Sequence, residues 1–438
     1  MTDFARPHVV IIGGGFGGLA AAQSLKHAPV SITLLDRRNH HVFQPLLYQV
    51  ATAALSPGDI AAPIRWILRR QKNVRVLLAE ALGIDLKSKG VELDEGSLEY
   101  DYLIVATGAT HAYFGHPEWE TFAPGLKTLD DALEIRGRML MAYEVAERET
   151  DPLERRRLLT FVIIGGGPTG VEMAGAIAEI ARQTLAHEFR AISPEQARVL
   201  LVEAGPSILS TFPADLRGEA RRSLERLAVE VREDAAVTGI DARGVQIGTE
   251  RIDAGTVMWA AGVAASPLSR SLGVPLDRAG RVLVSPDLTV PGHPDVFVIG
   301  DLAALTDADG RPLPGVAPVA QQQAAHAARN IMRHVERQPL RPFKYRNYGN
   351  LATIGRASAI ADFGRVHLSG FVGWLVWLFV HIMKLVGFRN RVLVLVQWAA
   401  AYMTYQRSVR LITGRLGQPR SESQPSSAVS RSTPVSPR

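Results

Sequence analysis

The chain has 438 residues, a formal net charge of +6, 47% hydrophobic residues and no cysteine. This length exceeds the roughly 100–200 residues of a typical domain, so we expect two globular domains and an appendage. Without cysteine the chain has no disulfides, thiolate metal sites, iron–sulfur clusters or dithiol centres, and electron chemistry would need a bound cofactor. The positive charge is compatible with anionic lipid, nucleic acid or a phosphate-bearing ligand and does not choose among them.

The first predicted unit is a buried strand, a glycine loop and a helix, in "HVVIIGGGFGGLAAAQSL". In this G-x-G-x-x-G pattern Gly13 makes the tight turn, Gly15 lets the backbone approach a pyrophosphate, and Gly18 allows the helix to pack closely on the strand. Asp36 ends the next strand, "SITLLD", where a carboxylate accepts hydrogen bonds from ribose hydroxyls. Because no signal peptide precedes this strand, we expect the globular part to remain in the cytoplasm.

The same order recurs in "TFVIIGGGPTGVEMAGAI", with Gly165, Gly167 and Gly170 in the loop and Glu203 as the acid. The spacing to Glu203 is longer than usual, so either the crossover helix is extended or "HEFRAISPEQ" is an insertion. No Arg or Lys directly follows Glu203, and a carboxylate repels a 2′-phosphate, which favours NADH over NADPH. The alternative is that the glycines of either loop only pack a strand against a helix.

Two similar halves follow from this repeat. Buried strands in "YDYLIVATGAT" and "AGTVMWAAGV" occupy equivalent places after the two loops, and "VFVIGD" delivers Asp301 at the end of a strand. Two dinucleotide sites without a substrate domain suggest a resident flavin, FAD, in the first site and a visiting pyridine nucleotide in the second. The tail, residues 416–438, is rich in Ser, Pro and Arg and is expected to be disordered.

The most apolar stretch, "GWLVWLFVHIMKLVGFRNR", is interrupted by charge too early to span a bilayer. At helical spacing one stripe carries aromatic and basic side chains, and the next segment repeats aromatic residues: Trp374, Trp377, His381, Lys384 and Phe388, then Trp398, Tyr402 and Tyr405. Such side chains favour the headgroup level, so we expect helices lying in the membrane interface. An apolar dimer interface or a lid on the core is the alternative.

The segments "QPLLYQVATAALSP", "APGLKTLDDALEIR", "GGGPTGVEMAGAIAE", "VFVIGDLA" and "GNLATIGRASAIADFG" together resemble the type II NADH:quinone oxidoreductase family, over roughly residues 7–415. The resemblance implies an α/β fold with two Rossmann-like dinucleotide-binding domains and a C-terminal amphipathic helical membrane-binding segment. It also implies FAD as the only redox centre, NADH as donor, and electron transfer to a membrane quinone without proton pumping.

Site residues follow from the same resemblance. It places Glu172 near the contact of nicotinamide and flavin, and the pair Gln322–Gln323 in the quinone site, although Ala317–Pro318 departs from the family's Ala-Gln. Further residues are expected at the FAD site: Phe16, Gly17, Arg37, Gln44, Ala81, Thr107, Gly108, Asp301, Ala320 and Gln321. Ala261 and Gly262 are expected at the NADH site.

Each of these roles has a structural alternative. Gln321–Gln323 could be the polar start of a surface helix, and Glu172, read as a residue of the first helical turn, could serve the helix dipole. His40, His41, His111 and His116 lack the spacing of metal ligands and are expected to be polar loop residues, so no metal site is predicted.

The expected domains are an FAD domain (1–125 and 285–345), an NADH domain (126–284) and a membrane-anchoring and dimerisation segment (346–415). We expect a homodimer on the cytoplasmic face of the inner (plasma) membrane, a lipid surface and ubiquinone or menaquinone as partners, and no nucleic acid. The nearest rival is a soluble NADH oxidase or flavin reductase of the same fold; a nucleotide-dependent scaffold protein is another. Sulfide:quinone oxidoreductase chemistry is excluded because it depends on cysteines.

Overall fold

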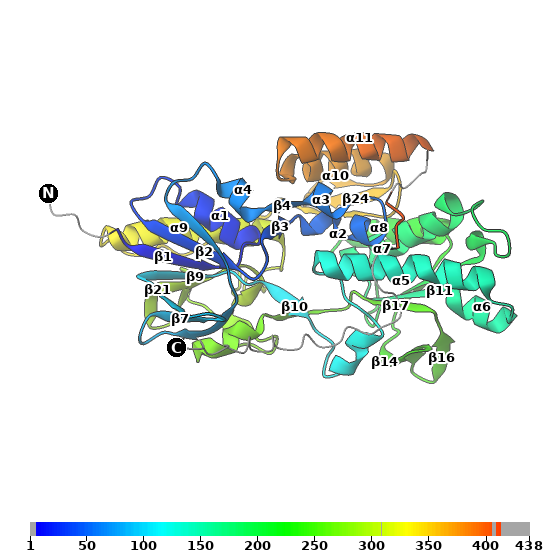
Figure 1. Ribbon diagram of the computed structural model, residues 1–438, viewed down its shortest axis with the longest axis horizontal. Helices are drawn as coiled ribbons and strands as arrows, with labels where there is room; N and C mark the ends of the chain where they lie inside the picture. The colour runs from blue at the N-terminus through cyan, green and yellow to red at the C-terminus, as the bar shows by residue number, and fades with distance from the viewer. Residues whose placement is uncertain (1–5, 308, 405–408, 413–438) are drawn as a thin grey trace, which may run out of the picture.

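The computed structural model describes residues 6–307, 309–404 and 409–412. Two lobes lie side by side, and a pair of C-terminal helices lies over their junction (Figure 1). The expected disordered tail and Tyr405 lie outside the described residues, as do the side chains of Phe388 and Tyr402.

The first lobe is built on a six-stranded sheet in the order β20-β21-β9-β1-β2-β5, parallel except for β20. Alternate residues of the central strand face opposite ways. Val9 and Ile11 pack on helices α1 and α9, whereas Val10 and Ile12 pack on a small antiparallel sheet, β6-β7-β8. The bounds are β1 (His8–Ile12), α1 (Phe16–Ser24), β2 (Ser31–Asp36), β5 (Val74–Leu78), β6 (Ala81–Asp85), β7 (Gly90–Leu93), β8 (Ser97–Glu99), β9 (Tyr102–Val105), β20 (Thr289–Val290), β21 (His293–Val298) and α9 (Ala317–Val335).

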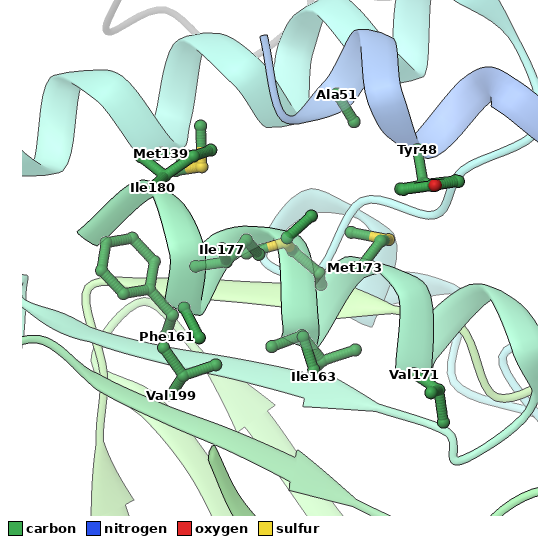
Figure 2. Packing of buried hydrophobic residues seen from close by; sticks show 14 of the residues in the cluster. Tyr48, Ala51, Met139, Phe161, Ile163, Val171, Met173, Ile177, Ile180 and Val199 are labelled. Carbon is green, nitrogen blue, oxygen red and sulfur yellow. The ribbon is translucent and has the colours of Figure 1, made fainter. Parts of the chain in front are cut away.

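The second lobe repeats this plan with a parallel sheet in the order β13-β12-β11-β17. Helix α7 lies between Ile163 and Val199 of this sheet and Tyr48, Ala51 and Met139 of helices α2 and α5 (Figure 2). The sheet β14-β15-β16 covers the opposite face. The bounds are α5 (Leu129–Arg148), α6 (Pro152–Leu158), β11 (Thr160–Ile164), α7 (Pro168–Glu179), β12 (Arg198–Val202), α8 (Ala214–Arg226), β13 (Val229–Arg232), β14 (Val237–Asp241), β15 (Gly244–Ile247), β16 (Glu250–Asp253) and β17 (Thr256–Trp259).

The two connections between the lobes pair with each other. Strand β10 (Ala109–His111) leaves the first lobe and β18 (Val263–Ala265) leaves the second, and they form an antiparallel ribbon. The remaining short elements are β3 (His40–Val42), α2 (Leu47–Ala51), α3 (Pro57–Ile60), β4 (Ala61–Pro63), α4 (Ile64–Leu68), β19 (Val282–Leu283) and β22 (Ala303–Ala304). The exact domain boundaries remain a prediction.

The C-terminal segment is a small sheet and two helices: β23 (Asn350–Thr353), β24 (Ala359–Asp362), β25 (His367–Leu368), α10 (Gly370–Lys384) and α11 (Phe388–Thr404). Its inward face is part of the core. Trp377 is 2% exposed, Gly373 lies directly against the Ala359 carbonyl, and the Trp398 indole donates a 2.7 Å hydrogen bond to Gln49. The expectation that the stripe of Trp374, Trp377 and His381 meets lipid headgroups is therefore wrong for Trp377, because this ring fills the space between the helices and the body.

The outward face of the same helices is apolar. It carries side chains that are each at least 44% exposed: Phe371, Val372, Leu375, Phe379, Met383, Val392, Leu395 and Val396. Along the described part of the chain, no helix is both long and apolar enough to span a bilayer; α10 has 15 residues and α11 has 17.

Candidate functional site

Both glycine loops adopt the same strained geometry. Gly13 and Gly165 have φ values of 103° and 109°, which L side chains rarely adopt. A Cβ on Gly18 would lie 1.7 Å from the Gly13 carbonyl oxygen, and a Cβ on Gly170 would lie 1.9 Å from that of Gly165. The helix in each lobe therefore packs on the strand at a distance that only glycine permits, as the sequence predicted.

The middle glycines face open space. No atom lies within 4 Å of a Cβ built on Gly15 or Gly167, each of which caps the N-terminus of the following helix, α1 or α7. Helix N-termini present unpaired N–H groups and a positive dipole end to anions. Each loop is therefore shaped to let a pyrophosphate approach the main chain closely.

The two predicted acids are held in equivalent positions. Asp36 accepts hydrogen bonds from the Gly14 amide at 2.6 Å and from the Arg38 amide at 2.7 Å. Glu203 accepts them from the Gly166 amide at 2.6 Å and the Gly205 amide at 2.7 Å. The carboxylates are thus fixed beside the loops by main-chain donors, where their remaining lone pairs can accept ribose hydroxyls.

The first site also contains a buried polar group that fits a ligand. The Thr107 hydroxyl, just after β9, is buried and has no hydrogen-bond partner among the described residues, and Gly108 follows with φ 68°. An unsatisfied buried hydroxyl is costly, so a polar group of FAD would relieve it. The residues present therefore fit the predicted cofactor.

The other predicted FAD residues lie in several different elements. Gly17 lies against Ile299, just before Gly300–Asp301, and Phe16 makes an edge contact with His41 at 5.0 Å between ring centroids. Ala81 is the first residue of β6. Two residues before it, the Ala79 amide donates a hydrogen bond to the Asp36 carbonyl. Arg37 is exposed and pairs with Glu80, and the Gln44 side chain donates to the Lys127 carbonyl at 3.3 Å.

The glutamines of α9 bind main-chain groups. Gln323 is 1% exposed, and its Oε1 accepts the Gly300 amide at 2.6 Å, which fixes the loop carrying Asp301. Gln322 donates to the Arg346 carbonyl at 2.9 Å and accepts the Arg346 amide at 3.0 Å. Gln323 is therefore no part of an exposed helix start. Ala320 is buried near Gly300, and Gln321 is half-buried.

Glu172 is buried on the face of α7 that meets the C-terminal segment. On the same face a Cβ on Gly175 would lie 3.1 Å from the Gly355 amide nitrogen, and Glu179 accepts the Arg356 amide. Burial raises the pKa of Glu172 to about 8, and a backbone hydrogen bond at Thr353 opposes the shift. This carboxyl is therefore protonated near neutral pH. The helix-dipole alternative is wrong in its premise, because the first turn of α7 contains no acidic residue.

Sequence reasoning missed two polar groups, one that contacts the first loop and one that contacts α11. His41 was expected in a polar loop, but it lies in β3, is 3% exposed and hydrogen-bonds to the Gly14 carbonyl at 3.1 Å. Gln49 accepts the Trp398 indole N–H and donates to the Tyr48 hydroxyl at 2.8 Å. A polar residue inside the apolar run "PLLYQVATAAL" was the available signal for Gln49.

The second site is bordered by the end of β17. The Cα of Ala261 lies 2.6 Å from where a Gly165 Cβ would stand, and Gly262 leaves room for the Phe114 ring. The Arg217 side chain of α8 donates to the Ser207 hydroxyl, four residues after Glu203. Arg217 thus brings a positive charge from α8 to the segment that follows Glu203. The residues directly after Glu203 in the sequence could not reveal this contact.

The paired loops and acids define a pyridine nucleotide oxidoreductase built from two dinucleotide-binding lobes. Residues 7–324 match the family described as pyridine nucleotide-disulphide oxidoreductase, and residues 348–407 match the NDH2 C-terminal domain. Since the chain lacks cysteine, the disulphide of the broader family's name has no counterpart here.

The chain is 50% identical over 432 residues to the type II NADH:quinone oxidoreductase NdhA of Mycobacterium tuberculosis, covering 94% of this chain and 90% of the relative. It is 47% identical over 427 residues to Ndh of the same organism, covering 93% and 90%. The chain therefore belongs to the type II NADH:quinone oxidoreductase family. This confirms the resemblance, the enzyme class, and FAD and NADH as cofactors.

Solved structures confirm the fold class. NDH2 from Plasmodium falciparum in complex with NADH superposes with a TM-score of 0.85 at 20% identity, covering 93% of this chain and 100% of that one. The sulfide:quinone oxidoreductase of Aquifex aeolicus reaches 0.72 at 20% identity, covering 88% and 92%. At these identities the likeness concerns the fold alone.

The two glycine positions of the first loop give a matched test. Gly15→Ala adds a methyl group in open space, so the apoprotein should keep its melting temperature while FAD affinity falls at least about tenfold, or 1.4 kcal/mol. Gly18→Ala forces the helix off the strand and should lower the melting temperature of the apoprotein as well. Calorimetric titration with FAD and thermal unfolding measure both effects. Unchanged FAD affinity in Gly15→Ala would contradict pyrophosphate binding at this loop.

Glu172 should give stability a characteristic pH dependence. Between pH 4.5 and about 8 the unfolded chain releases this proton and the folded protein retains it, so wild-type stability falls as pH rises through that window. Glu172→Gln removes this pH-dependent contribution and should melt at least about 3 °C above wild type at pH 8, with the difference shrinking as the pH falls and vanishing only well below pH 4.5. The exposed control Glu120→Gln should show no such trend. A Glu172→Gln difference that is independent of pH would rule out a buried neutral carboxyl.

Proposed function

We propose that this chain passes electrons from NADH to a membrane quinone through bound FAD, without pumping protons. The observation that carries the proposal is the equivalence of the two loops, in which glycine geometry, open middle glycine and main-chain-held acid recur in both lobes. One lobe holds a resident dinucleotide and the other receives a second one. When bound, FAD supplies the redox chemistry, and the protein supplies position and electrostatics.

In the first lobe, the amides at the start of α1 hold the FAD pyrophosphate and Asp36 accepts a ribose hydroxyl. Gln323 fixes Gly300, which sets the position of Asp301 beside the cofactor. Gln322 fixes the Arg346 main chain and so sets the entry to the C-terminal segment. These glutamines position other groups, and any contact with quinone is secondary to that role.

In the second lobe, the start of α7 holds the NADH pyrophosphate and Glu203 accepts the adenosine ribose hydroxyls. A carboxylate fixed by two amides cannot move away from a 2′-phosphate, so NADH is preferred over NADPH.

Glu172 supplies a proton. Reduction of a quinone to a quinol consumes two electrons and two protons, and NADH supplies both electrons and only one of those protons. A buried carboxyl with a pKa of about 8 is protonated at neutral pH and can act as a general acid between the nicotinamide lobe and the C-terminal segment.

The quinone reaches the protein from a lipid surface that contacts the outward face of α10 and α11. Apolar side chains cover that face, with Phe379 64% exposed and Val396 60% exposed. A cationic and aromatic rim flanks it: Lys384 is exposed, and Arg69 lies 4.2 Å over the Trp66 ring, which is next to Gly387. This combination matches an anionic membrane interface. The protein sits there as a homodimer on the cytoplasmic face of the inner membrane, with ubiquinone or menaquinone as acceptor.

Rapid mixing tests the reaction. NADH should bleach the flavin absorbance of wild-type protein, and a soluble quinone should restore it, whereas NADPH should act at least about tenfold more slowly. Glu203→Gln should slow reduction by NADH and narrow that preference, and the exposed control Glu120→Gln should not. Reoxidation by oxygen but not by quinone would identify a soluble NADH oxidase, and equal rates with NADPH would exclude the role of Glu203.

Charge on the apolar face tests the membrane contact. Phe379→Glu should abolish cosedimentation with phosphatidylglycerol vesicles while FAD content stays unchanged, because interfacial binding scales with buried apolar area. Leu153→Glu, at a 77% exposed apolar position on α6, is the matched control and should sediment like wild type. If Phe379→Glu instead converts a dimer to monomers and leaves vesicle binding intact, the face is a subunit interface.

A further inference from the structure

A second hollow lies in the NADH lobe, at the opposite end of the sheet from the glycine loop. It has a volume of about 810 Å³, and its walls come from α6, the turn after α7, and the starts of β12 and β13. Strand β12 runs from Arg198 at the hollow to Val202, next to Glu203. At about 3.3 Å per residue this strand separates the hollow from the nucleotide acid by roughly 16 Å. The hollow is therefore distinct from the NADH site.

Arginines dominate the charge of this hollow. Four line it, and Arg198 is matched by Glu230 in a bidentate pair with both bonds at 2.7 Å. A second acid of the lining, Glu225, pairs with Arg221 outside it. Arg155, Arg156 and Arg182 then face Glu195, an exposed carboxylate at the edge. The hollow keeps an excess of guanidinium groups that its own acids do not neutralise.

Two of these arginines have buried nitrogen atoms without partners. The Nη1 of Arg182 and the Nε of Arg155 are both buried and make no hydrogen bond within the described part of the chain. The other end of Arg182 is anchored, because its Nη2 lies 3.4 Å from the Ala197 carbonyl and 3.3 Å from the Ala228 carbonyl. Buried charged donors without acceptors cost free energy, and because both arginines line the hollow, an anion there would offset their positive charge.

Two segments that nucleotide binding does not require contribute residues to this hollow. Arg182 lies in a π-helical turn, Ile180–Thr184, and such turns recur at functional sites. The segment "HEFRAISPEQ" follows, and Glu147 holds it by accepting the amides of Arg190, Ala191 and Ile192. Its last residues, Glu195 and Gln196, form one wall of the hollow. The long segment between the second glycine loop and Glu203 thus forms part of this hollow.

We propose that this hollow is a second anion site, which takes a small soluble phosphate-bearing molecule. Guanidinium groups bind phosphate oxygens through parallel hydrogen bonds, and Arg155, Arg156 and Arg182 line the hollow. Leu159 and Val229 give the hollow an apolar wall for the uncharged part of the ligand. The volume is that of an ordinary small-molecule site.

Calorimetric titration of the FAD-loaded, full-length protein tests this site. Pyrophosphate is the probe, and NAD⁺ saturates the second glycine loop, at the start of α7. Wild type should bind pyrophosphate with a saturable heat. Arg182→Gln and Arg156→Gln should each raise the dissociation constant at least about tenfold. Arg182→Lys should also weaken binding, because it keeps the charge and loses the fork. Arg278→Gln removes an equal charge at an exposed position of the first lobe and should bind like wild type.

Several results would overturn the proposal. One is the absence of saturable binding to wild type in the presence of NAD⁺. Another is equal weakening in Arg278→Gln, which would mean that net charge alone is responsible. If Arg182→Gln loses its FAD through misfolding, Arg156→Gln decides the matter, because the Arg156 side chain is exposed and makes no hydrogen bond or ion pair within the described part of the chain. Unchanged affinity in Arg156→Gln would then exclude the site.

Discussion

The closest main-chain approach in each lobe sets the position of everything functional. Gly18 and Gly170 lie so close to the carbonyls of Gly13 and Gly165 that no side chain fits between helix and strand. This contact aims the N-terminus of each helix at the carboxyl end of its sheet, where ligands of open α/β folds bind. It also brings the amides of Gly14 and Gly166 to the two acids. The proposed anion binding and ribose recognition therefore depend on the same packing.

Helix α7 transmits this constraint to the rest of the molecule. One side of it packs on the sheet and the other on α2 and α5, while Glu172, Gly175 and Glu179 face the C-terminal segment. The helix whose N-terminus forms the proposed dinucleotide site thus also carries the buried carboxyl and packs against β23 of the C-terminal segment. Any shift of α7 would therefore move the second glycine loop, Glu172 and the contact with β23 together.

The sequence was most informative where a single residue type is sterically required. The glycines, Asp36 and Glu203 could be predicted because strand, turn and helix have fixed spacing and only glycine fits the contact. It was least informative where partners come from remote segments. The bonds of Gln322 and Gln323 to Arg346 and Gly300, the burial of His41 and the approach of Arg217 depend on tertiary packing. Trp377 was assigned to the wrong side because helical spacing defines a stripe without saying which stripe faces inward.

The C-terminal helices belong to the core on one side and face outward on the other. Trp377 is packed inside, and the Trp398 indole is hydrogen-bonded to Gln49, so the inner face is held by the protein itself. A detergent that competes for Phe379 and Val396 need not disturb these contacts. Under the proposed membrane contact, the protein can therefore leave a bilayer as a folded, flavin-loaded particle, and its attachment would be reversible within the lifetime of one molecule.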